Sequence, residues 1–496
     1  MLVVALASSL GVAGSAAAGG GVGTITEYPL PSGNGIQSSI TFGKDGRLWF
    51  PVVFPDKVGA ITTKGVIAMY PITSGSGSYG ARLGPDGNLW LAEHDGRRVG
   101  AMSTSGALLH DYPTGTYTSP YDVAAGTDGN LWWTDEEFGV GKIGRITTGG
   151  AVTEFTGLTS FPRQITAGPD GNLWFTENYN GGNSKIGRIT TSGTVTEFPL
   201  ANAGAAPNGI AAGPDGNVWF TEQATSGNKI GKITPSGTIT EYPLPTANAA
   251  PEYIAAGPDG NLWFTEEGQQ KVGRITPGGT ITEFPIPGAG PVGITIGPDG
   301  NMWFLEGGSH KAARISVADK NTGYMLVSDA GVIAKTLKLK KQGMTAEWVF
   351  EGPSVHTATD SSGMGLFDSG DHAIGSSYSF AFAAAGSYGF HDSHYGKIKG
   401  TVKVPIVVTL TDPSDASVTW SSAPGPGGYV FDVQLAQPGS SSFLNWKTSQ
   451  TAMSASFGPG DPLYVGAGKY QFRARLRKLA NGAASGYSDA KAVTLS

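Results

Sequence analysis

The chain has 496 residues, too many for one ordinary domain, and it carries 77 glycines, 15% charged residues and 10% aromatic residues. The net charge of −6 gives no electrostatic footprint for nucleic acid, and a sequence with no cysteine excludes disulfides, thiolate metal sites and a cysteine nucleophile. Gly, Pro, Asp and Asn recur throughout without sustained 3.6-residue apolar periodicity, so we expect an all-β protein of short strands and tight turns.

Residues 1–23 are expected to form a leader. An apolar run of signal-peptide length is followed by small residues around Ala17 that suit a cleavage site, although a basic segment is missing at the start. The alternative is a membrane anchor, but the apolar run is short and passes into Gly and Ala. We therefore expect a secreted protein with no membrane span once the leader is removed.

A ten-residue phrase, GPDGNLWFTE at 168–177, recurs almost unchanged at 213–222 and 257–266. Looser copies lie at 43–52, 84–93, 126–136 and 297–306. Successive copies start 40 to 45 residues apart, which is the period of a four-stranded propeller blade. One repeat predicts an inner strand at 208–212, a second at 217–222, a third at 229–234 and an outer strand at 238–244. The pattern predicts a seven-bladed β-propeller over residues 24–317.

The ends of this region predict how the ring closes. The last repeat reaches its third strand at 312–316 and lacks the outer strand that ends the other repeats. Residues 24–31 (TITEYPLP) match the outer strand at 238–245. We expect the N-terminal strand to complete the seventh blade, because closure of this kind leaves no long exposed strand edge.

Two series of residues are expected on one face of the propeller, here called the mouth, where inner strands start and second strands end. The first series is the acid that ends the repeated phrase: Glu93, Asp135 or Glu136, Glu177, Glu222, Glu266 and Glu306. This acid can accept backbone hydrogen bonds from a neighbouring blade. Alternatively it can bind a metal, for which Glu222, Glu266 and Glu306 are the candidates.

The second series occupies the x position of a Pro-x-Gly-Ile-like pattern, in which the proline is present from the third repeat onward, and its residue varies among the repeats. Its members are Asn34, Tyr79, Tyr121, Arg163, Asn208, Glu252 and Val292. Such variation inside a constant frame marks either a binding surface or an exposed position that drifts freely. On the first interpretation, the candidate ligand-binding residues are Tyr79, Tyr121, Arg163, Asn208 and Val292.

The repeated phrase, followed by segments such as KIGRIT and GTITEYPLP, resembles the streptogramin B lyase (virginiamycin B lyase) family over about 60% of the chain. The resemblance implies an elimination that opens the ester-closed ring of a cyclic depsipeptide antibiotic. It implies a histidine base in a Pro-His-x-Ile turn of a late blade, with nearby glutamates holding magnesium.

This sequence departs from that pattern in its late turns. They read Pro-Glu-Tyr-Ile at 251–254 and Pro-Val-Gly-Ile at 291–294, without histidine. Glu252 can replace the base only if burial raises its pKa. His94, which follows Glu93, is the other candidate base, and the alternative is an ordinary surface histidine.

Residues 325–405 resemble a cupredoxin β-sandwich. His356 stands at the first ligand position, His391 where the family has cysteine, and His394 at the second histidine. Blue-copper electron transfer needs a thiolate and is excluded. The three imidazoles can still bind copper or zinc, and the alternative is a packing domain without a metal.

Residues 406–496 resemble a fibronectin type III β-sandwich, with Trp420 in an early strand and Tyr470 as a tyrosine-corner residue. Three functions therefore stay open. The favoured one is an extracellular, monomeric binding or scaffold protein whose mouth takes a small molecule, peptide or glycan. The others are a magnesium-dependent lyase and a copper or zinc binder.

Overall fold

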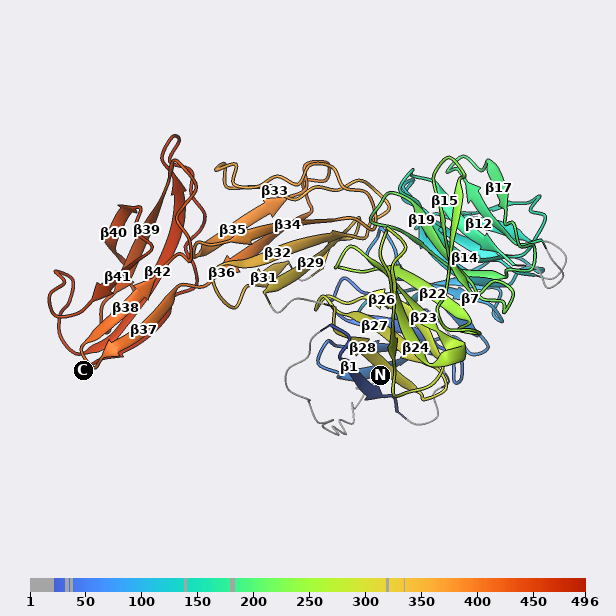
Figure 1. Ribbon diagram of the computed structural model, residues 1–496, viewed down its shortest axis with the longest axis horizontal. Coiled ribbons are helices and arrows are strands. Elements are labelled where there is room, and N and C mark those ends of the chain that lie inside the picture. Colours follow the sequence, from blue (N-terminus) through green and yellow to red (C-terminus); the bar gives the residue numbers. More distant parts are fainter. Residues whose placement is uncertain are drawn as a thin grey trace, which may run out of the picture.

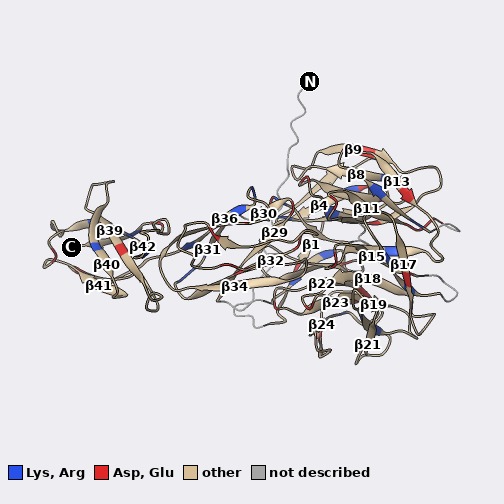
Figure 2. Ribbon diagram, turned by 90° about the horizontal axis from the view of Figure 1, so that it is seen from above, with Lys and Arg blue, Asp and Glu red and all other residues tan. Residues whose placement is uncertain are grey.

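The computed structural model describes residues 22–31, 35, 39–137, 141–178, 183–317, 321–333 and 335–496. The predicted all-β class is confirmed there: strands dominate, and the single helical turn is a 3-10 turn at Glu267–Gln269. A ring of sheets is followed by two pairs of sheets, with the last pair farthest from the ring (Figure 1; Figure 2). These ranges contain no helix long and apolar enough to cross a membrane. Most of the expected leader lies outside them.

Seven four-stranded antiparallel sheets occupy the described residues before 318. The inner strands are β2 (Thr41–Phe42), β6 (Ser78–Leu83), β10 (Pro120–Ala125), β14 (Pro162–Ala167), β18 (Pro207–Ala212), β22 (Pro251–Ala256) and β26 (Pro291–Ile296). The second strands are β3 (Leu48–Val52), β7 (Leu89–Glu93), β11 (Leu131–Asp135), β15 (Leu173–Glu177), β19 (Val218–Glu222), β23 (Leu262–Glu266) and β27 (Met302–Glu306). The third strands are β4 (Lys57–Ile61), β8 (Arg98–Met102), β12 (Lys142–Ile146), β16 (Lys185–Ile189), β20 (Lys229–Ile233), β24 (Lys271–Ile275) and β28 (Lys311–Ile315). The outer strands are β5 (Ile67–Pro71), β9 (Leu108–Pro113), β13 (Val152–Phe155), β17 (Val195–Pro199), β21 (Ile239–Pro243), β25 (Ile281–Pro285) and β1 (Ile25–Pro29).

The inner strands form a closed ring, because each contacts the inner strand of the next sheet and β26 contacts β2. This is the arrangement of a β-propeller. The expected closing strand is present, since β1 pairs antiparallel with β28, Ile25 opposite Ile315 and Pro29 opposite Lys311. The ring of Tyr28 also stacks on Trp303, with ring centroids 5.4 Å apart.

The GPDG turns organise the opposite face of the ring, here called the turn face. In the fourth sheet, Asp170 Oδ1 accepts a hydrogen bond of 2.9 Å from Trp174 Nε1 and one of 3.3 Å from the Asn172 amide. The other six sheets repeat the Asp–Trp bond at 2.9 to 3.2 Å. Each buried tryptophan therefore finds an acceptor for its N–H within its own turn.

The glycine of the KIGRIT segment is required by a close approach. A Cβ on Gly187 would lie 2.1 Å from Cε2 of Phe175 on the neighbouring strand. The same clash recurs at Gly231 with Phe220 and at Gly273 with Phe264. The aromatic ring of the second strand therefore packs directly on the backbone of the third strand.

The second part of the chain has two four-stranded sheets, β30-β29-β32-β34 and β31-β36-β35-β33. Their strands are β29 (Thr322–Ser328), β30 (Gly331–Ile333), β31 (Thr336–Lys338), β32 (Met344–Phe350), β33 (Thr359–Asp360), β34 (Ser377–Phe382), β35 (Gly386–His391) and β36 (Lys399–Val404). β29 pairs parallel with β32, and β31 pairs parallel with β36. Trp348 of one sheet and Tyr388 of the other belong to one hydrophobic core.

The third part pairs a three-stranded sheet, β37-β38-β41, with a four-stranded sheet, β40-β39-β42-β43. Its strands are β37 (Val407–Asp412), β38 (Asp415–Thr419), β39 (Tyr429–Ala436), β40 (Leu444–Gln450), β41 (Ser454–Phe457), β42 (Gly468–Lys478) and β43 (Lys491–Leu495). The buried Tyr470 donates its hydroxyl to the Gly466 carbonyl at 2.8 Å. Trp420 is buried as well.

Candidate functional site

The mouth brings three of the predicted residues into direct contact. The rings of Tyr79 and Tyr121 stack with centroids 5.7 Å apart, and the His94 ring meets Tyr79 edge-on at 5.3 Å. Tyr79 and Tyr121 lie at the start of neighbouring inner strands, and His94 directly follows β7. The antiparallel pairing therefore places all three on the mouth face of the ring. Both tyrosines are half-buried, which leaves part of each ring accessible.

Arg163 continues this cluster on β14, the inner strand that follows that of Tyr121. Its guanidinium lies over the Tyr121 ring, 4.8 Å from the centroid, and pairs with Glu136 at 2.9 Å. Glu136 also approaches His94 Nε2 at 3.2 Å. Glu136 was considered only as an alternative to Asp135 in the acidic series, and the sequence offered no signal for its bridging role.

Two carboxylates flank the His94 ring and favour its protonated form. Its Nδ1 lies 2.7 Å from Asp95 Oδ1, so both ring nitrogens face carboxylates. The hydrogen bond to Glu136 and then that to Asp95 outweigh burial and raise the pKa of His94. An imidazolium flanked in this way has no lone pair free to take a proton from a substrate.

Glu252 lies beside the aromatic cluster and is half-buried. Burial raises its pKa to about 8, assisted by the charge of Glu267 and opposed by Arg163. Its Oε2 is buried without a hydrogen-bond partner among the described residues. The carboxyl is therefore protonated at neutral pH, where it can donate a hydrogen bond, and becomes a base as the pH rises through about 8.

The remaining residues of the variable series are less accessible. Asn208 is 5% exposed, and its Oδ1 has no partner among the described residues; Val292 is also 5% exposed. Asn34 lies outside the described residues.

Two mouth-side aromatics that the sequence did not predict are far more exposed, Phe54 at 71% and Tyr117 at 74%. They lie in loops beside the inner and second strands and do not follow the repeat.

The threonine of the repeated phrase fastens neighbouring sheets at the mouth. Thr221 Oγ1 accepts from the Gly209 amide of its own sheet at 2.8 Å and donates to the Glu252 carbonyl of the next sheet at 3.0 Å. Thr176 makes the same pair of bonds, to the Gln164 amide and the Asn208 carbonyl. Each bridge holds the backbone of a residue in the variable series.

The glutamate after that threonine behaves differently from either prediction. Glu177, Glu222, Glu266 and Glu306 are fully buried, and their carboxylate oxygens accept no hydrogen bond from the described residues. Each instead adjoins an acid of the outer strand that pairs with a third-strand lysine, as Glu197 pairs with Lys185 at 2.7 Å. The prediction that this acid accepts backbone hydrogen bonds from a neighbouring sheet is wrong for these four.

Among the described residues, no three His, Asp or Glu side chains group closely enough to hold a metal ion. Glu222, Glu266 and Glu306 end second strands of three different sheets.

The expected histidine cluster of the second part is likewise not formed. His356 is buried between Asp329 and Asp392 at 2.8 and 2.7 Å, whereas His394 is 44% exposed and pairs with Asp371 at 2.7 Å. His391 is half-buried on β35, opposite Thr359 and Lys399.

These features define a β-propeller with an accessible mouth of aromatic and paired charged residues. The virginiamycin B lyase family model matches residues 19–156, 81–184 and 114–351, so the chain belongs to this family. A streptogramin B lyase structure is 35% identical, with a TM-score of 0.55, and the match covers 60% of this chain and 98% of that one. A catalytically inactive histidine-to-alanine variant of virginiamycin B lyase from Staphylococcus aureus, solved with quinupristin, is 34% identical with the same TM-score and covers 60% of this chain and 99% of that one. A search of curated proteins gave no match.

Proposed function

We propose that this protein is an extracellular binding protein built on the seven-bladed propeller of its family, with the mouth as its ligand site. The observation that carries this proposal is the state of His94. Both of its ring nitrogens contact carboxylates, so neither nitrogen of the histidine nearest the mouth aromatics is free to act as a base. The late turns, where the family has its histidine base, carry Glu252 and Val292.

The chemistry of the mouth favours a ligand with apolar or aromatic surface and hydrogen-bonding groups. Tyr79 and Tyr121 offer ring faces, and the protonated Glu252 offers a donor. The charge of Arg163 is already compensated by Glu136. A peptide, depsipeptide or glycan fits these groups better than a small polyanion does. The exposed Tyr117 and Phe54 extend the apolar surface along the rim.

The test uses a streptogramin B as the probe, with and without magnesium. Calorimetry should show binding that weakens roughly tenfold or more in Tyr79→Ala and Tyr121→Ala. Leu109→Ala, which removes an exposed apolar side chain from an outer strand, is the matched control and should bind normally. Mass spectrometry should show no linearised product. Unchanged binding in both tyrosine variants would overturn the ligand site.

A second candidate is the family's magnesium-dependent lyase reaction, with Glu252 as the base. It is supported by family membership and by the raised pKa of Glu252, which occupies a late-turn position. It predicts linearised product that requires magnesium, increases as the pH rises through about 8, and disappears in Glu252→Gln. Detection of such product would replace the binding proposal with this one.

The same proposal extends to the C-terminal parts as a cupredoxin-like and a fibronectin type III-like β-sandwich. The parallel strand pairs β29–β32 and β31–β36 support the first assignment. The three-plus-four sheet pair and the bond from Tyr470 to a carbonyl four residues upstream support the second. We assign these parts a structural role without a metal, because His356 is occupied by two carboxylates.

A further inference from the structure

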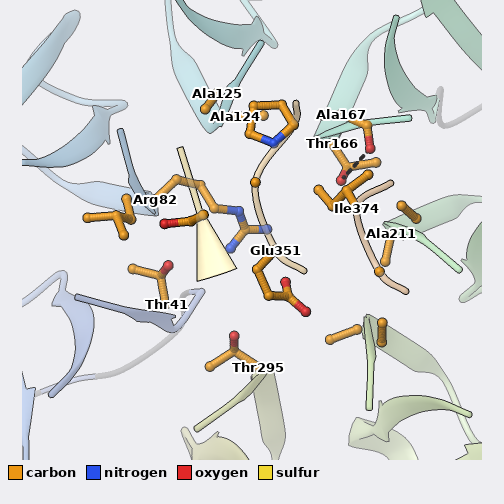
Figure 3. A pocket seen from close by; sticks show the side chains of 18 of the residues that line it. Thr41, Arg82, Ala124, Ala125, Thr166, Ala167, Ala211, Thr295, Glu351 and Ile374 are labelled. Carbon is orange, nitrogen blue, oxygen red and sulfur yellow. Dashed lines mark hydrogen bonds between the residues drawn. The ribbon is translucent and has the colours of Figure 1, made fainter. Parts of the chain in front are cut away.

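The channel at the centre of the ring contains one charged side chain at a position where the other sheets have small ones. The corresponding residues line a cavity of about 130 Å³ on the turn side and are Thr41, Arg82, Ala124, Thr166, Ala211, Ala255 and Thr295. Arg82 points into the centre of the ring (Figure 3). Nothing in the repeat itself requires an arginine here, since the equivalent positions hold Ala or Thr.

The opposite wall of this cavity belongs to the second part of the chain. Three of its loops, 328–330, 351–353 and 374–375, line the same cavity. Glu351 and Arg82 enter the centre from different walls (Figure 3). The propeller therefore meets the second part across its own channel.

The charges in the channel form a row. Arg82 lies 3.9 Å from the buried Asp122 on one side, and Asp122 Oδ2 accepts the Ile165 amide at 3.2 Å. On the other side, burial raises the pKa of Glu351 to about 7, and the charge of Arg82 opposes that rise. Glu351 Oε1 is buried without a hydrogen-bond partner among the described residues, and the charge of Arg82 favours the ionised carboxylate against this burial.

Apolar contacts surround this charge row on the turn face. Leu326 and Val349 of the second part share a hydrophobic core with Phe42 and Trp303 of the propeller. Ile374 packs against the core that joins the third and fourth sheets. The backbones also approach closely, because a Cβ on Gly375 would lie 2.8 Å from the Ala212 carbonyl oxygen. The second part thus packs over the turn side of the channel.

We propose that the second part is an intramolecular stopper of the channel, locked by Glu351 against Arg82. Its three loops close the turn side, so a ligand reaches the channel from the mouth alone. This goes beyond ligand binding at the mouth and does not depend on it. It also gives the second part a role that needs no metal.

The absence of cysteine from the sequence allows a clean accessibility test in the full-length protein. Ala255→Cys places a thiol in the cavity. Ser105→Cys places one on an exposed turn that does not line the cavity. A thiol reagent too large to pass through the channel from the mouth should label the first at least roughly tenfold more slowly than the second. Adding Glu351→Arg, which opposes two like charges, should raise the labelling rate of the Ala255→Cys protein roughly tenfold.

A charge swap provides the control for this experiment. Glu351→Arg combined with Arg82→Glu should restore slow labelling, and circular dichroism should show an intact fold in each variant. If Glu351→Arg does not fold, Glu351→Gln should give a smaller acceleration in the same direction. Equal labelling of Ala255→Cys and Ser105→Cys in proteins that keep Glu351 would overturn the stopper. Rates insensitive to both Glu351 variants would overturn the lock.

Discussion

At the residue scale, burial favours the neutral form of the repeated acid that ends the second strand. Burial raises the pKa of Glu177 and Glu266 to about 8, and the nearby acids Glu197 and Glu283 push in the same direction while the strand lysines oppose them. A neutral carboxyl avoids the cost of a buried charge beside a second carboxylate. The residue that fastens neighbouring sheets is the preceding threonine.

This state makes stability depend on pH. The folded pKa of Glu177 lies above its unfolded value, so its contribution is complete below about pH 4.5 and is lost as the pH rises through about 8. The free energy of unfolding should fall by roughly 1–3 kcal/mol per such group between pH 6 and pH 9. Glu177→Gln cannot ionise and should lose less stability over this range in urea titrations. A parallel decline in parent and variant would contradict the assignment.

The charged state of His94 can be tested through its neighbours. Glu136 is the largest cause of its raised pKa, and Asp95 a smaller one. Glu136→Gln should therefore lower the pKa of His94 more than Asp95→Asn does, as measured by NMR titration of the imidazole protons. The reverse order would show that Glu136, which bridges His94 and Arg163, is not the main cause of the raised pKa of His94.

The repeat explains how much of the mouth could be predicted. Tyr79, Tyr121 and Arg163 share one position of a periodic sequence, so the period alone places them at one end of the channel. Glu136 lies one residue beyond the second strand, and its contact with Arg163 depends on side-chain reach between neighbouring sheets. The period contains no information on that reach, nor on the buried setting of Asn208 and Val292.

At the scale of the element, a single hydroxyl joins three strands. Thr221 on β19 bonds the Gly209 amide on β18 and the Glu252 carbonyl on β22. Thr221→Val keeps the shape but leaves both backbone groups without this partner in a buried place, which should cost about 1–3 kcal/mol of unfolding free energy. It should also weaken ligand binding at the mouth, because Glu252 loses its backbone support.

Thr221→Ser is the matched control for this prediction. It keeps both hydrogen bonds and removes one buried methyl group, so its cost should stay at or below about 1 kcal/mol. Chemical denaturation of both variants measures the difference. Equal losses would contradict the bridge as the main contribution of Thr221, because the hydroxyl would then contribute no more than the methyl group.

Strand existence and order followed from the sequence because turn, strand and period all agree within each repeat. The second part shows the limit of the same reasoning. Its histidines fit a ligand spacing along the chain, yet Asp329 and Asp392 occupy His356 in space. The histidine spacing carried no information on these carboxylates, which come from separate segments of the second part.

At the scale of the whole molecule, segments distant in the sequence pack together at two places. β1 completes the last sheet of the ring, and the loops of the second part enter the channel. Both joins link segments that are distant in sequence. Because the chain has no cysteine, they are held by non-covalent contacts. The first was predictable because the outer strand of the last repeat is missing and reappears at residues 24–31. The second depends on Arg82 and Glu351, which belong to no motif.

The ring closure should therefore control how fast the propeller opens. Tyr28→Ala removes the ring that stacks on Trp303 across the join, and Tyr242→Ala removes the equivalent stack on Trp219 within a covalently continuous sheet. Each should cost about 1–3 kcal/mol. Because β1 is held to β28 only by pairing and packing, Tyr28→Ala should accelerate unfolding in urea more than Tyr242→Ala does, as followed by tryptophan fluorescence. Equal unfolding rates would show that the ring opens elsewhere.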